Sequence, residues 1–537
     1  MYKNICLSLF LVACSTFTVY AYEAFQGPTE LIQHDPSKAY QGYTIFSPFR
    51  GKNTYLIDMH GQVVHSWPYP DGFGAPGQEQ IEKHARLLED GLLLRGVIDR
   101  SQHRPRSPVP GATYQLVDWD GEVVWEYFDE RPGYRGHHDF RMIWNPKLEQ
   151  HTLLYISSRD IDHEESIALG LDPALNDDYS SRPDGLIEVD LDGNIIWEWN
   201  VSDHVVQERD ANLPNYGIVS ESAGKLDIYF SGRPVSGDWI HANSLDYNYE
   251  LDQIVINNSS HSEFYVIDHG NTFIPGDLEQ SKELAASDKG DFLFRWGNPC
   301  IYDAGDCPSS LNEGTSSTNG HQQLFFTHDI QWIRDKEIGT GSNELDGAGN
   351  FLIFDNGTRR LSQVYSSIRE INPYDGPMSE GNYVPEMLAG HTPSRPAGMG
   401  MGRDTIAQLS NQIVWSYVPP ISNAFYGTYI SGTQRLPNGN TLVCSGPHGH
   451  IFEVTTDGEV VWEYISPVGD RTQGDYGIYE TMTADTGTFF SAFFKCARYS
   501  PEYSGLEGKN LTPRGKITEL FTNEPARPAR PEAPLTP

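Results

Sequence analysis

Histidines at matching places along the chain are the residues best able to do chemistry. They are His84, His138 with His137 beside it, His241 and His328, and each stands at or just before an apolar segment. A neutral imidazole can act as a nucleophile or base near neutral pH, and its protonated form can protonate a leaving group. A single histidine is more often a core residue bonded to a carbonyl, but a converging set favours a functional site.

The equivalence of these histidines rests on a repeat. Four segments share an alternating apolar and polar run, a turn glycine, and a β-branched pair with an aromatic residue: 54–67, 114–127, 186–199 and 451–464. Each pattern predicts a β-hairpin. Two more hairpins, stretched by insertions, are predicted at 264–298 and 367–417. The repeated tryptophans are expected in the contacts between neighbouring sheets: Trp67, Trp125, Trp197, Trp296, Trp415 and Trp462.

An inner pair of strands completes a four-stranded antiparallel sheet with each hairpin. These pairs are predicted at 84–96, 137–157, 241–256, 328–357, 432–446 and 476–494. Six such sheets predict an all-β, six-bladed β-propeller in which hairpin 54–67 completes the blade begun at Tyr476. Seven blades stay open because strands are also predicted at 43–49 and 516–521. Innermost strands line the channel of a propeller, so we expect the histidines around one mouth of it.

The two ends of the chain do not belong to the repeat. Residues 1–21 combine Lys3 with an apolar run and a small-residue end, which is typical of a signal peptide and predicts a periplasmic or secreted protein. The alternative is a lipoprotein anchored through Cys14, since LVAC fits a lipobox. We expect one propeller domain over residues 22–521 and a disordered, proline-rich tail over 522–537.

Charge and hydropathy exclude several classes of partner. The net charge of −35 argues against nucleic acid and against an anionic membrane surface as partners. Beyond the leader, no stretch is long and apolar enough to span a bilayer.

Four cysteines follow the leader, an even number that predicts disulfides in an exported protein. We expect Cys300 to pair with Cys307 and Cys444 to pair with Cys496. Neither CxxC nor HxxxH spacing is present to indicate a zinc site, and no cofactor is expected. Insertions at 299–326, 334–348 and 375–411 belong to no repeat and are expected to wall one side of a pocket.

Several segments around the histidines resemble one known family. They are GHHDF (136–140), DWIHANS (238–244), LFFTHDIQWI (324–333), NFLIFDNGTRR (350–360) and QRLPNGNTLVCSG (434–446). This set resembles the bacterial arylsulfotransferases, which are propellers, over most of the chain from about residue 40 to 470. The resemblance implies a form without the N-terminal β-sandwich domain that one branch of the family carries.

The resemblance implies sulfuryl transfer from an aryl sulfate to a phenol through a sulfated histidine, without a nucleotide sulfate donor. His328 looks like the nucleophile, and His241 and His138 look like the groups that bind sulfate or protonate the leaving phenol. We expect substrate contacts from His84, His137, Asn243, Arg359 and Tyr247. Asp329 is not expected to orient His328, because neighbouring side chains of a strand point to opposite faces.

One departure from the family keeps two other hypotheses open. The family carries an active-site arginine in an SSRH-like segment, whereas this chain has NNSSH at 257–261. Arg359, Arg233 or Arg295 could supply the missing cation. One alternative is a polysaccharide lyase that cleaves an anionic, uronate-containing and sulfated algal glycan by β-elimination, using the same histidines with Tyr247, Tyr249 or Tyr476. The other alternative is a propeller that binds a ligand without catalysis.

Overall fold

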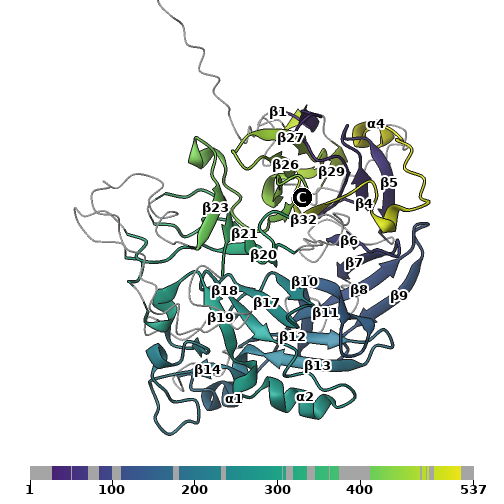
Figure 1. Ribbon diagram of the computed structural model, residues 1–537. Coiled ribbons are helices and arrows are strands. Elements are labelled where there is room, and N and C mark those ends of the chain that lie inside the picture. Colours follow the sequence, from purple (N-terminus) through teal and green to yellow (C-terminus); the bar gives the residue numbers. More distant parts are fainter. Residues whose placement is uncertain are drawn as a thin grey trace, which may run out of the picture.

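Six four-stranded antiparallel sheets make up a computed structural model of the chain, and they form a six-bladed β-propeller (Figure 1). The structure describes residues 27–49, 51–69, 84–98, 111–172, 181–230, 237–304, 306–309, 318–334, 345–361, 363–373, 412–471, 475–478, 481–482 and 489–521. The predicted fold class is therefore confirmed, with six blades. The predicted signal peptide, Cys14 and the predicted tail at 522–537 lie outside the described residues.

The first three blades are numbered here in the order of their hairpins. Blade 1 contains β32 (Phe493–Tyr499), β3 (Tyr43–Pro48), β4 (Asn53–Ile57) and β5 (Val63–Pro68). Blade 2 contains β6 (Ala85–Leu87), β7 (Leu93–Ile98), β8 (Ala112–Val117) and β9 (Val123–Phe128). Blade 3 contains β10 (Tyr134–Asn145), β11 (Gln150–Arg159), β12 (Asp184–Val189) and β13 (Ile195–Asn200).

The remaining blades follow the same plan. Blade 4 contains β16 (Leu245–Asn248), β17 (Gln253–Asn258), β18 (Glu263–Asp268) and β19 (Phe292–Trp296). Blade 5 contains β20 (Thr327–Trp332), β21 (Phe351–Asp355), β22 (Ser367–Ile371) and β23 (Ile413–Tyr417). Blade 6 contains β24 (Gly432–Arg435), β25 (Thr441–Ser445), β26 (His450–Val454) and β27 (Val460–Ile465), and β2 (Glu30–His34) pairs with its outer edge.

Both ends of the chain close the ring, but in a different way from the prediction. Blade 1 takes only its inner strand, β32, from the C-terminal part, and β3 pairs with it from the N-terminal part. The predicted strand at 43–49 is thus the second strand of this blade, so it founds no seventh blade. The pair predicted at 476–494 is wrong, because β29 (Asp475–Ile478) and β31 (Phe489–Phe490) pair instead with β28 (Val468–Arg471). The strand predicted at 516–521 is a helix, α4 (Ile517–Phe521).

The predicted tryptophans join each blade to the next around the whole ring. The indole of Trp67 donates to the carbonyl of Asp118 in the hairpin of blade 2, at 3.0 Å. The next four tryptophans donate in turn to the backbone or side-chain oxygens of Leu191, Thr272, Gln412 and Thr456 in the following hairpins. Trp462 of blade 6 donates to the carbonyl of Met59 in blade 1 at 2.9 Å, which completes the ring. A buried indole needs a partner for its N–H, and the neighbouring hairpin supplies it. The predicted inter-blade role is confirmed.

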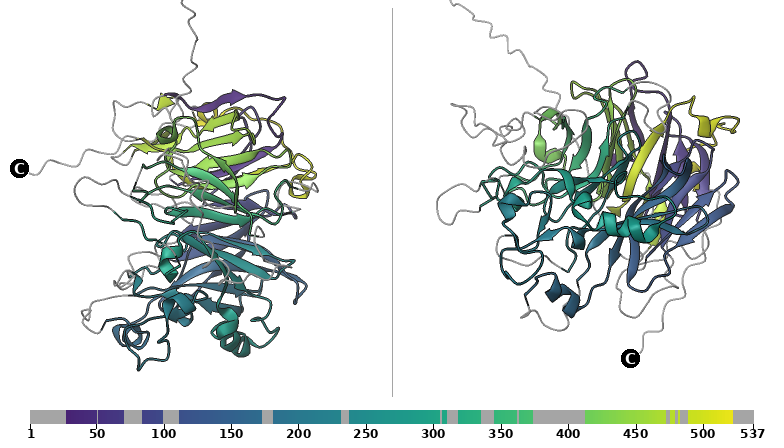
Figure 2. Two further views of the ribbon diagram at one scale, coloured as in Figure 1. Left: turned by 60° about the vertical axis from the view of Figure 1, so that its left-hand side comes forward. Right: turned by 60° about the horizontal axis from the view of Figure 1, so that its bottom comes forward.

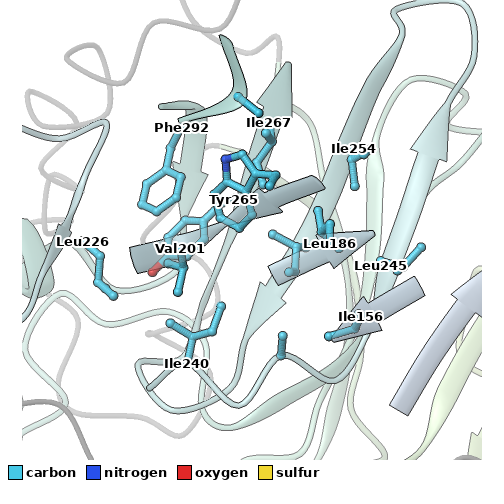
Figure 3. Close-up of a cluster of buried hydrophobic side chains, with 14 of the residues drawn as sticks. Ile156, Leu186, Val201, Leu226, Ile240, Leu245, Ile254, Tyr265, Ile267 and Phe292 are labelled. Carbon is cyan, nitrogen blue, oxygen red and sulfur yellow. The ribbon is translucent and has the colours of Figure 1, made fainter. Parts of the chain in front are cut away.

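Apolar side chains fill the spaces between blades. Figure 3 shows the cluster between blades 3 and 4, in which Ile156 and Leu186 face Ile254 and Tyr265. Short helices and strands outside the blades extend this cluster: α1 (His163–Ala168), β14 (Val205–Val206), β15 (Leu226–Asp227) and α2 (Leu278–Ala285). Figure 1 shows α1 and α2 at one edge of the ring, and Figure 2 shows that edge turned forward. Another short pair, β1 (Gly27–Pro28) with β30 (Thr481–Met482), lies outside the blades. Within the described residues no helix is both long and apolar enough to cross a membrane.

Candidate active site

The predicted histidines come together at the centre of the ring, where the inner strands begin. The imidazole rings of His138 and His241 lie 5.0 Å apart between centroids. The ring of Phe494, from β32, lies 5.3 Å from that of His84. The same ring is 6.0 Å from His138 and 6.3 Å from His328. Histidines from blades 2, 3 and 5 therefore lie around one phenylalanine of blade 1, and His241, just before blade 4, lies against His138.

Irregular backbone at the inner strands aims these side chains. The pairing of β10 with β11 shifts register around His138, and that of β20 with β21 shifts around Asp329. His138, His241 and Asp329 have left-handed φ values of 56°, 47° and 54°. A bulge turns side chains that a regular strand would place elsewhere, and each left-handed residue costs about 1–3 kcal/mol. Such strain at the centre of the ring is typical of a functional site.

His328 is held as a neutral imidazole with a defined tautomer. Its Nδ1 lies 2.7 Å from Oδ1 of Asn356, whose amide nitrogen donates to the carbonyls of Gly427 and Ile430. The amide oxygen therefore accepts, and Nδ1 carries the proton. Burial lowers the pKa of His328 to about 3, and the nearby charges of His241 and Lys495 act in the same direction. The lone pair is on Nε2, where it accepts a 3.1 Å hydrogen bond from the N–H of Ile430.

His241 has the opposite character. Its Nδ1 donates to Oδ2 of Asp238 at 2.6 Å, and its side chain is 34% exposed. Burial alone would lower the pKa of His241, but the hydrogen bond and charge of Asp238 outweigh it and raise that pKa above its ordinary value. His241 is thus suited to donate a proton from Nε2.

His138 lies next to His241 and is supported by three other side chains. Its Nδ1 is 2.7 Å from Nδ1 of His137, whose Nε2 donates to Oδ1 of Asp184 at 3.1 Å. His84 is buried, and its Nε2 donates to the carbonyl of His138 at 3.0 Å. Burial and the neighbouring histidines hold the pKa of His138 well below its usual range. His84 therefore contacts the backbone of His138 and lies behind it, and His137 links it to a carboxylate.

Arg359 brings a cation to the place where the family arginine is missing. Its Nη1 donates to the carbonyl of Ser260 at 2.9 Å, within the segment 257–261. Its guanidinium lies 5.0 Å over the ring of Phe326, which is itself 6.4 Å from His241 and 5.6 Å from His328. Arg359 is exposed, and its charge is close enough to act on the pKa of His241.

Of the other two arginines considered for this role, the structure describes only Arg295. Arg295 is fully buried and paired with Glu263 at 2.6 Å. Arg233 lies outside the described residues.

Asn243 lies in the wall of the site rather than on its surface. It is fully buried, and its amide nitrogen donates to the carbonyl of Thr327 at 2.8 Å and to Oγ of Ser259 at 2.5 Å. Its Oδ1 accepts from Asn257 at 2.8 Å. The side chain of Asn243 therefore does not make the expected contact with substrate. Its polar atoms are already used in hydrogen bonds that order this loop, including one to Thr327, the residue before His328.

Tyr247 lies against a histidine outside the candidate site, His269, with 5.8 Å between the ring centroids. It follows the start of β16 by two residues, and its hydroxyl donates at 2.7 Å to Asp252, in the turn between β16 and β17. Tyr249 belongs to the same turn region and is exposed. The prediction that Tyr247 contacts the substrate therefore does not match its position, since a strand carries successive side chains away from its start. The side chain of Tyr476 is outside the described residues.

The cysteines divide into one disulfide and two thiols. Cys300 and Cys307 form the predicted bridge, which is confirmed. The predicted bridge between Cys444 and Cys496 is wrong, since both are free thiols. Cys444 belongs to β25 of blade 6 and Cys496 to β32 of blade 1. Packing of the two sheets brings the two thiols close enough to interact, but no disulfide joins them. Burial raises the pKa of Cys444 well above its usual value.

The insertions attach at both ends of blade 5. Those at 334–348 and 375–411 join β20 to β21 and β22 to β23, so they leave from the end of the sheet opposite His328. The expectation that these two wall the pocket is not supported by their attachment points. The insertion at 299–326 joins β19 to β20 and ends two residues before His328, so it meets blade 5 at the same end as His328.

Sequence reasoning missed the partners that set the state of each histidine. Asp238 lies in DWIHANS, three residues before His241, and Asn356 lies in FDNG, directly before Gly357. These short spacings were the available signal for their roles. Asp184 comes from another strand of blade 3, Phe494 and Lys495 come from blade 1, and no local pattern marks them. Among the described residues, no group of three or more histidine, cysteine, aspartate or glutamate side chains could hold a metal ion.

The fold and the centre of the ring define a six-bladed propeller with a histidine site. Residues 111–367 match the model of the family described as Arylsulfotransferase (ASST). Together with the propeller, this match supports an arylsulfotransferase-family protein. The family match supports an arylsulfotransferase-like function, suggests a transferase and implies small aryl substrates.

Further comparisons add little to this. No curated protein matches the chain. A solved structure of a protein of unknown function from Bacteroides caccae is 10% identical, covers 86% of this chain and 99% of that chain, and has a TM-score of 0.38. A putative 6-phosphogluconolactonase from Bacteroides fragilis is 10% identical, with coverages of 86% and 99% and a TM-score of 0.32. A streptogramin B lyase structure is 10% identical, with coverages of 82% and 83% and a TM-score of 0.31. At these identities and TM-scores the likenesses carry no argument about function.

Proposed function

We propose that the protein transfers a sulfuryl group from an aryl sulfate to a phenol by way of a sulfated His328. The observation that carries this proposal is the contrast between a neutral His328 and an Asp238-bound His241 on either side of the half-buried ring of Phe326. Phe326 lies between these histidines and below Arg359, so an aryl sulfate bound against it would meet a nucleophile, an acid and a cation. These are the groups that sulfuryl transfer requires.

In the first half-reaction, the lone pair on Nε2 of His328 attacks the sulfur atom. The N–S bond forms as the bond from sulfur to the phenolic oxygen breaks. The leaving oxygen takes the proton of Nε2 of His241, because a departing phenoxide has a conjugate acid near pKa 10 and is a poor leaving group. Asn356 stabilises the positive charge that develops on His328 through the hydrogen bond at Nδ1.

In the second half-reaction, the oxygen of the acceptor phenol attacks sulfur and the N–S bond breaks. The electron pair returns to Nε2 of His328, and the acceptor proton passes to His241, which the first step left neutral. The site thus returns to its starting state. His138, whose ring lies 5.0 Å from that of His241 between centroids, is the proposed contact for the oxygen atoms of the sulfuryl group in both steps.

Arg359 is the proposed replacement for the family arginine. Its guanidinium reaches the carbonyl of Ser260 from the opposite loop, so a cation stands at the site although the local sequence there is neutral. Charge-assisted hydrogen bonds to sulfate oxygens favour such a side chain.

The hydrogen bond from Ile430 opposes the reaction in the free protein. The lone pair that must attack sulfur accepts the N–H of Ile430 at 3.1 Å, and substrate must displace this bond. Ile430 and Ser431 have left-handed φ values of 47° and 95°, so this turn is already strained. The lyase alternative has less support, because two of the tyrosines suggested for it, Tyr247 and Tyr249, lie in and near the turn between β16 and β17.

The proposed location is the periplasm or the exterior of the cell. The disulfide between Cys300 and Cys307 supports an oxidising compartment. Residues 1–21 are the proposed signal peptide, and residues 22–521 are the proposed single propeller domain.

A trapping experiment tests the proposed function. Purified protein is mixed with excess 4-nitrophenyl sulfate without an acceptor, and a burst of one nitrophenolate per active site is expected. Peptide mass spectrometry should then find the sulfuryl group on the peptide that contains His328, and the His328→Asn variant should show no burst. A sulfated His241 would instead assign the nucleophile to that residue. The absence of any burst, together with no turnover on adding phenol, would refute the proposal.

A further inference from the structure

Lys495 occupies the centre of the ring beneath the histidines. It belongs to β32, follows Phe494 and is 6% exposed. Its Nζ lies 2.6 Å from Oδ2 of Asp139 and 2.6 Å from Oδ1 of Asp329. Asp139 directly follows His138 in blade 3, and Asp329 directly follows His328 in blade 5. One ammonium group from blade 1 therefore joins the residues next to two histidines of the site.

Both aspartates are parts of the irregular backbone that aims the histidines. Oδ2 of Asp139 accepts the N–H of Leu245 at 3.0 Å, and Oδ2 of Asp329 accepts the N–H of Thr433 at 2.7 Å. Each carboxylate thus ties its own inner strand to that of the next blade. Because Lys495 holds both of them, its two ion pairs fix the strand starts of blades 3 and 5 with respect to each other.

Lys495 is not the missing sulfate-binding cation. Its charge is shared between two buried carboxylates, while Arg359 is exposed beside Phe326. Breaking either pair to bind sulfate would leave a buried carboxylate without a cation, which is strongly unfavourable. The ring of Phe494, next to Lys495 in the strand, contacts both His138 and His328. The strand therefore meets the two histidines with an aromatic ring and their aspartate neighbours with an ammonium group.

We infer that Lys495 is a positioning residue that sets the separation and orientation of His138 and His328 by clamping Asp139 and Asp329. The kinetic part of this inference rests on the proposed function. A displacement of about 1 Å between reacting groups can cost about 10²-fold in rate, so a clamp of this kind affects turnover without touching substrate. It also means that the site is incomplete until the last inner strand of the ring, β32, has joined blade 1.

The test compares Lys495→Met with Lys495→Arg in the full chain. We expect Lys495→Met to lower kcat for 4-nitrophenyl sulfate and phenol by about 10²-fold while KM changes by less than about threefold. Lys495→Arg keeps the charge, and its kcat should be at least about tenfold higher than that of Lys495→Met. The matched control is Lys38→Met, which removes a surface lysine paired with Glu459 at 2.7 Å and should leave both constants unchanged. A folded Lys495→Met protein with the wild-type kcat, or a loss that lies entirely in KM, would overturn the inference.

A second measurement separates this inference from the proposed function. In protein with 15N-labelled histidines, the ring nitrogen signals of His328, assigned with His328→Asn, report its tautomer. Lys495→Met should replace the single Nδ1–H form with averaged signals, and Lys495→Arg should keep it. If the wild type transfers no sulfuryl group, the proposed function fails, and these signals still decide the inference. Unchanged His328 signals in Lys495→Met would overturn it.

A neutral variant covers the case in which Lys495→Met does not fold. Removing the lysine alone leaves two buried carboxylates unpaired, whereas replacing all charged members together is much less costly. The Asp139→Asn, Asp329→Asn, Lys495→Met protein is therefore measured in the same two ways, with the same expected losses and the same overturning results.

Discussion

Two regions of the molecule bury a histidine with opposite results. At the centre of the ring His328 is neutral, whereas His269, held between two carboxylates, is charged. His269 lies between blades 3 and 4, where Nε2 is 2.9 Å from Glu188 and Nδ1 is 2.6 Å from Asp252. Burial alone would lower its pKa, but the charge of Glu188 and the hydrogen bonds to both carboxylates raise the pKa of His269 to about 9. His328 is buried to a similar degree and has a pKa of about 3.

The number of carboxylates in contact explains the difference. His269 has two, His241 has one, and the ring nitrogens of His328 contact only an amide oxygen and a backbone N–H. Burial disfavours the charged imidazole, and each carboxylate within hydrogen-bond distance favours it. The protein thus has a charged histidine that stabilises the fold, an intermediate one suited to donate a proton, and a neutral one suited to attack.

The largest expected effect is the loss of the neutral nucleophile. His328→Asn should lower kcat by about 10⁴-fold, because the covalent path through a sulfated histidine is removed. Initial rates of nitrophenolate release with phenol as acceptor measure this. His269→Gln serves as the buried control and should keep kcat near wild type in folded protein. Equal losses in the two variants would show that the comparison reflects stability and not chemistry.

Removal of the single carboxylate at His241 should give the next largest effect. Asp238→Asn lowers the pKa of His241, so at neutral pH the proton for the leaving oxygen is absent. We expect a loss of about 10³-fold for an aryl sulfate with a weakly acidic leaving phenol and a much smaller loss for 4-nitrophenyl sulfate. Rates for a series of substituted aryl sulfates test this. Asp252→Asn, at His269, should leave the leaving-group dependence as in the wild type. The same fractional loss for every leaving group in Asp238→Asn would contradict the role of His241 as the acid.

A pH-dependent loss of stability should follow from His269→Gln. Because the folded pKa of about 9 exceeds the unfolded value of about 6.5, this histidine stabilises the fold fully below pH 6.5 and loses that effect as the pH rises through 9. The shift corresponds to about 3 kcal/mol for this buried group. Urea unfolding of wild type and variant at pH 6 and pH 10 should show a large difference at pH 6 that shrinks by about this amount. A difference independent of pH would show that His269 is neutral in the folded protein.

The smallest effect is expected at the rim of the site. Arg359→Ala should raise KM for aryl sulfates by about tenfold, since an exposed guanidinium contributes one charge-assisted contact. Arg359→Lys should recover part of the loss. Titration of the protein with inorganic sulfate by calorimetry provides a second reading. If sulfate affinity is the same in wild type and Arg359→Ala, another cation binds the sulfuryl group.

Much of the architecture could be predicted because the repeat is local. Turn glycines such as Gly121 and Gly458 adopt positive φ, and the hairpins form where the alternating pattern places them. The tryptophans bridge the blades as expected. Ring closure was predicted incorrectly because strand 43–48 and strand 493–499 are both plausible in several pairings, and only packing of the finished ring selects one.

The site could be predicted only in part. The matching histidines converge, but Asn243 and Tyr247 make contacts elsewhere. A residue near a histidine in the sequence need not point its side chain in the same direction. The argument that Asp329 does not orient His328 agrees with its position, yet Asp329 contacts Lys495, which is 166 residues away in the sequence.

The sequence by itself determined the all-β propeller class, the hairpins and the kinds of side chain available at the centre, because these follow from short-range periodicity. Only the tertiary structure decided which histidine is neutral and which is charged. That choice depends on burial and on single contacts, such as Asp238 with His241, Asn356 with His328 and Lys495 with two aspartates. Such contacts join distant blades, and their energies depend on distances that no sequence pattern specifies.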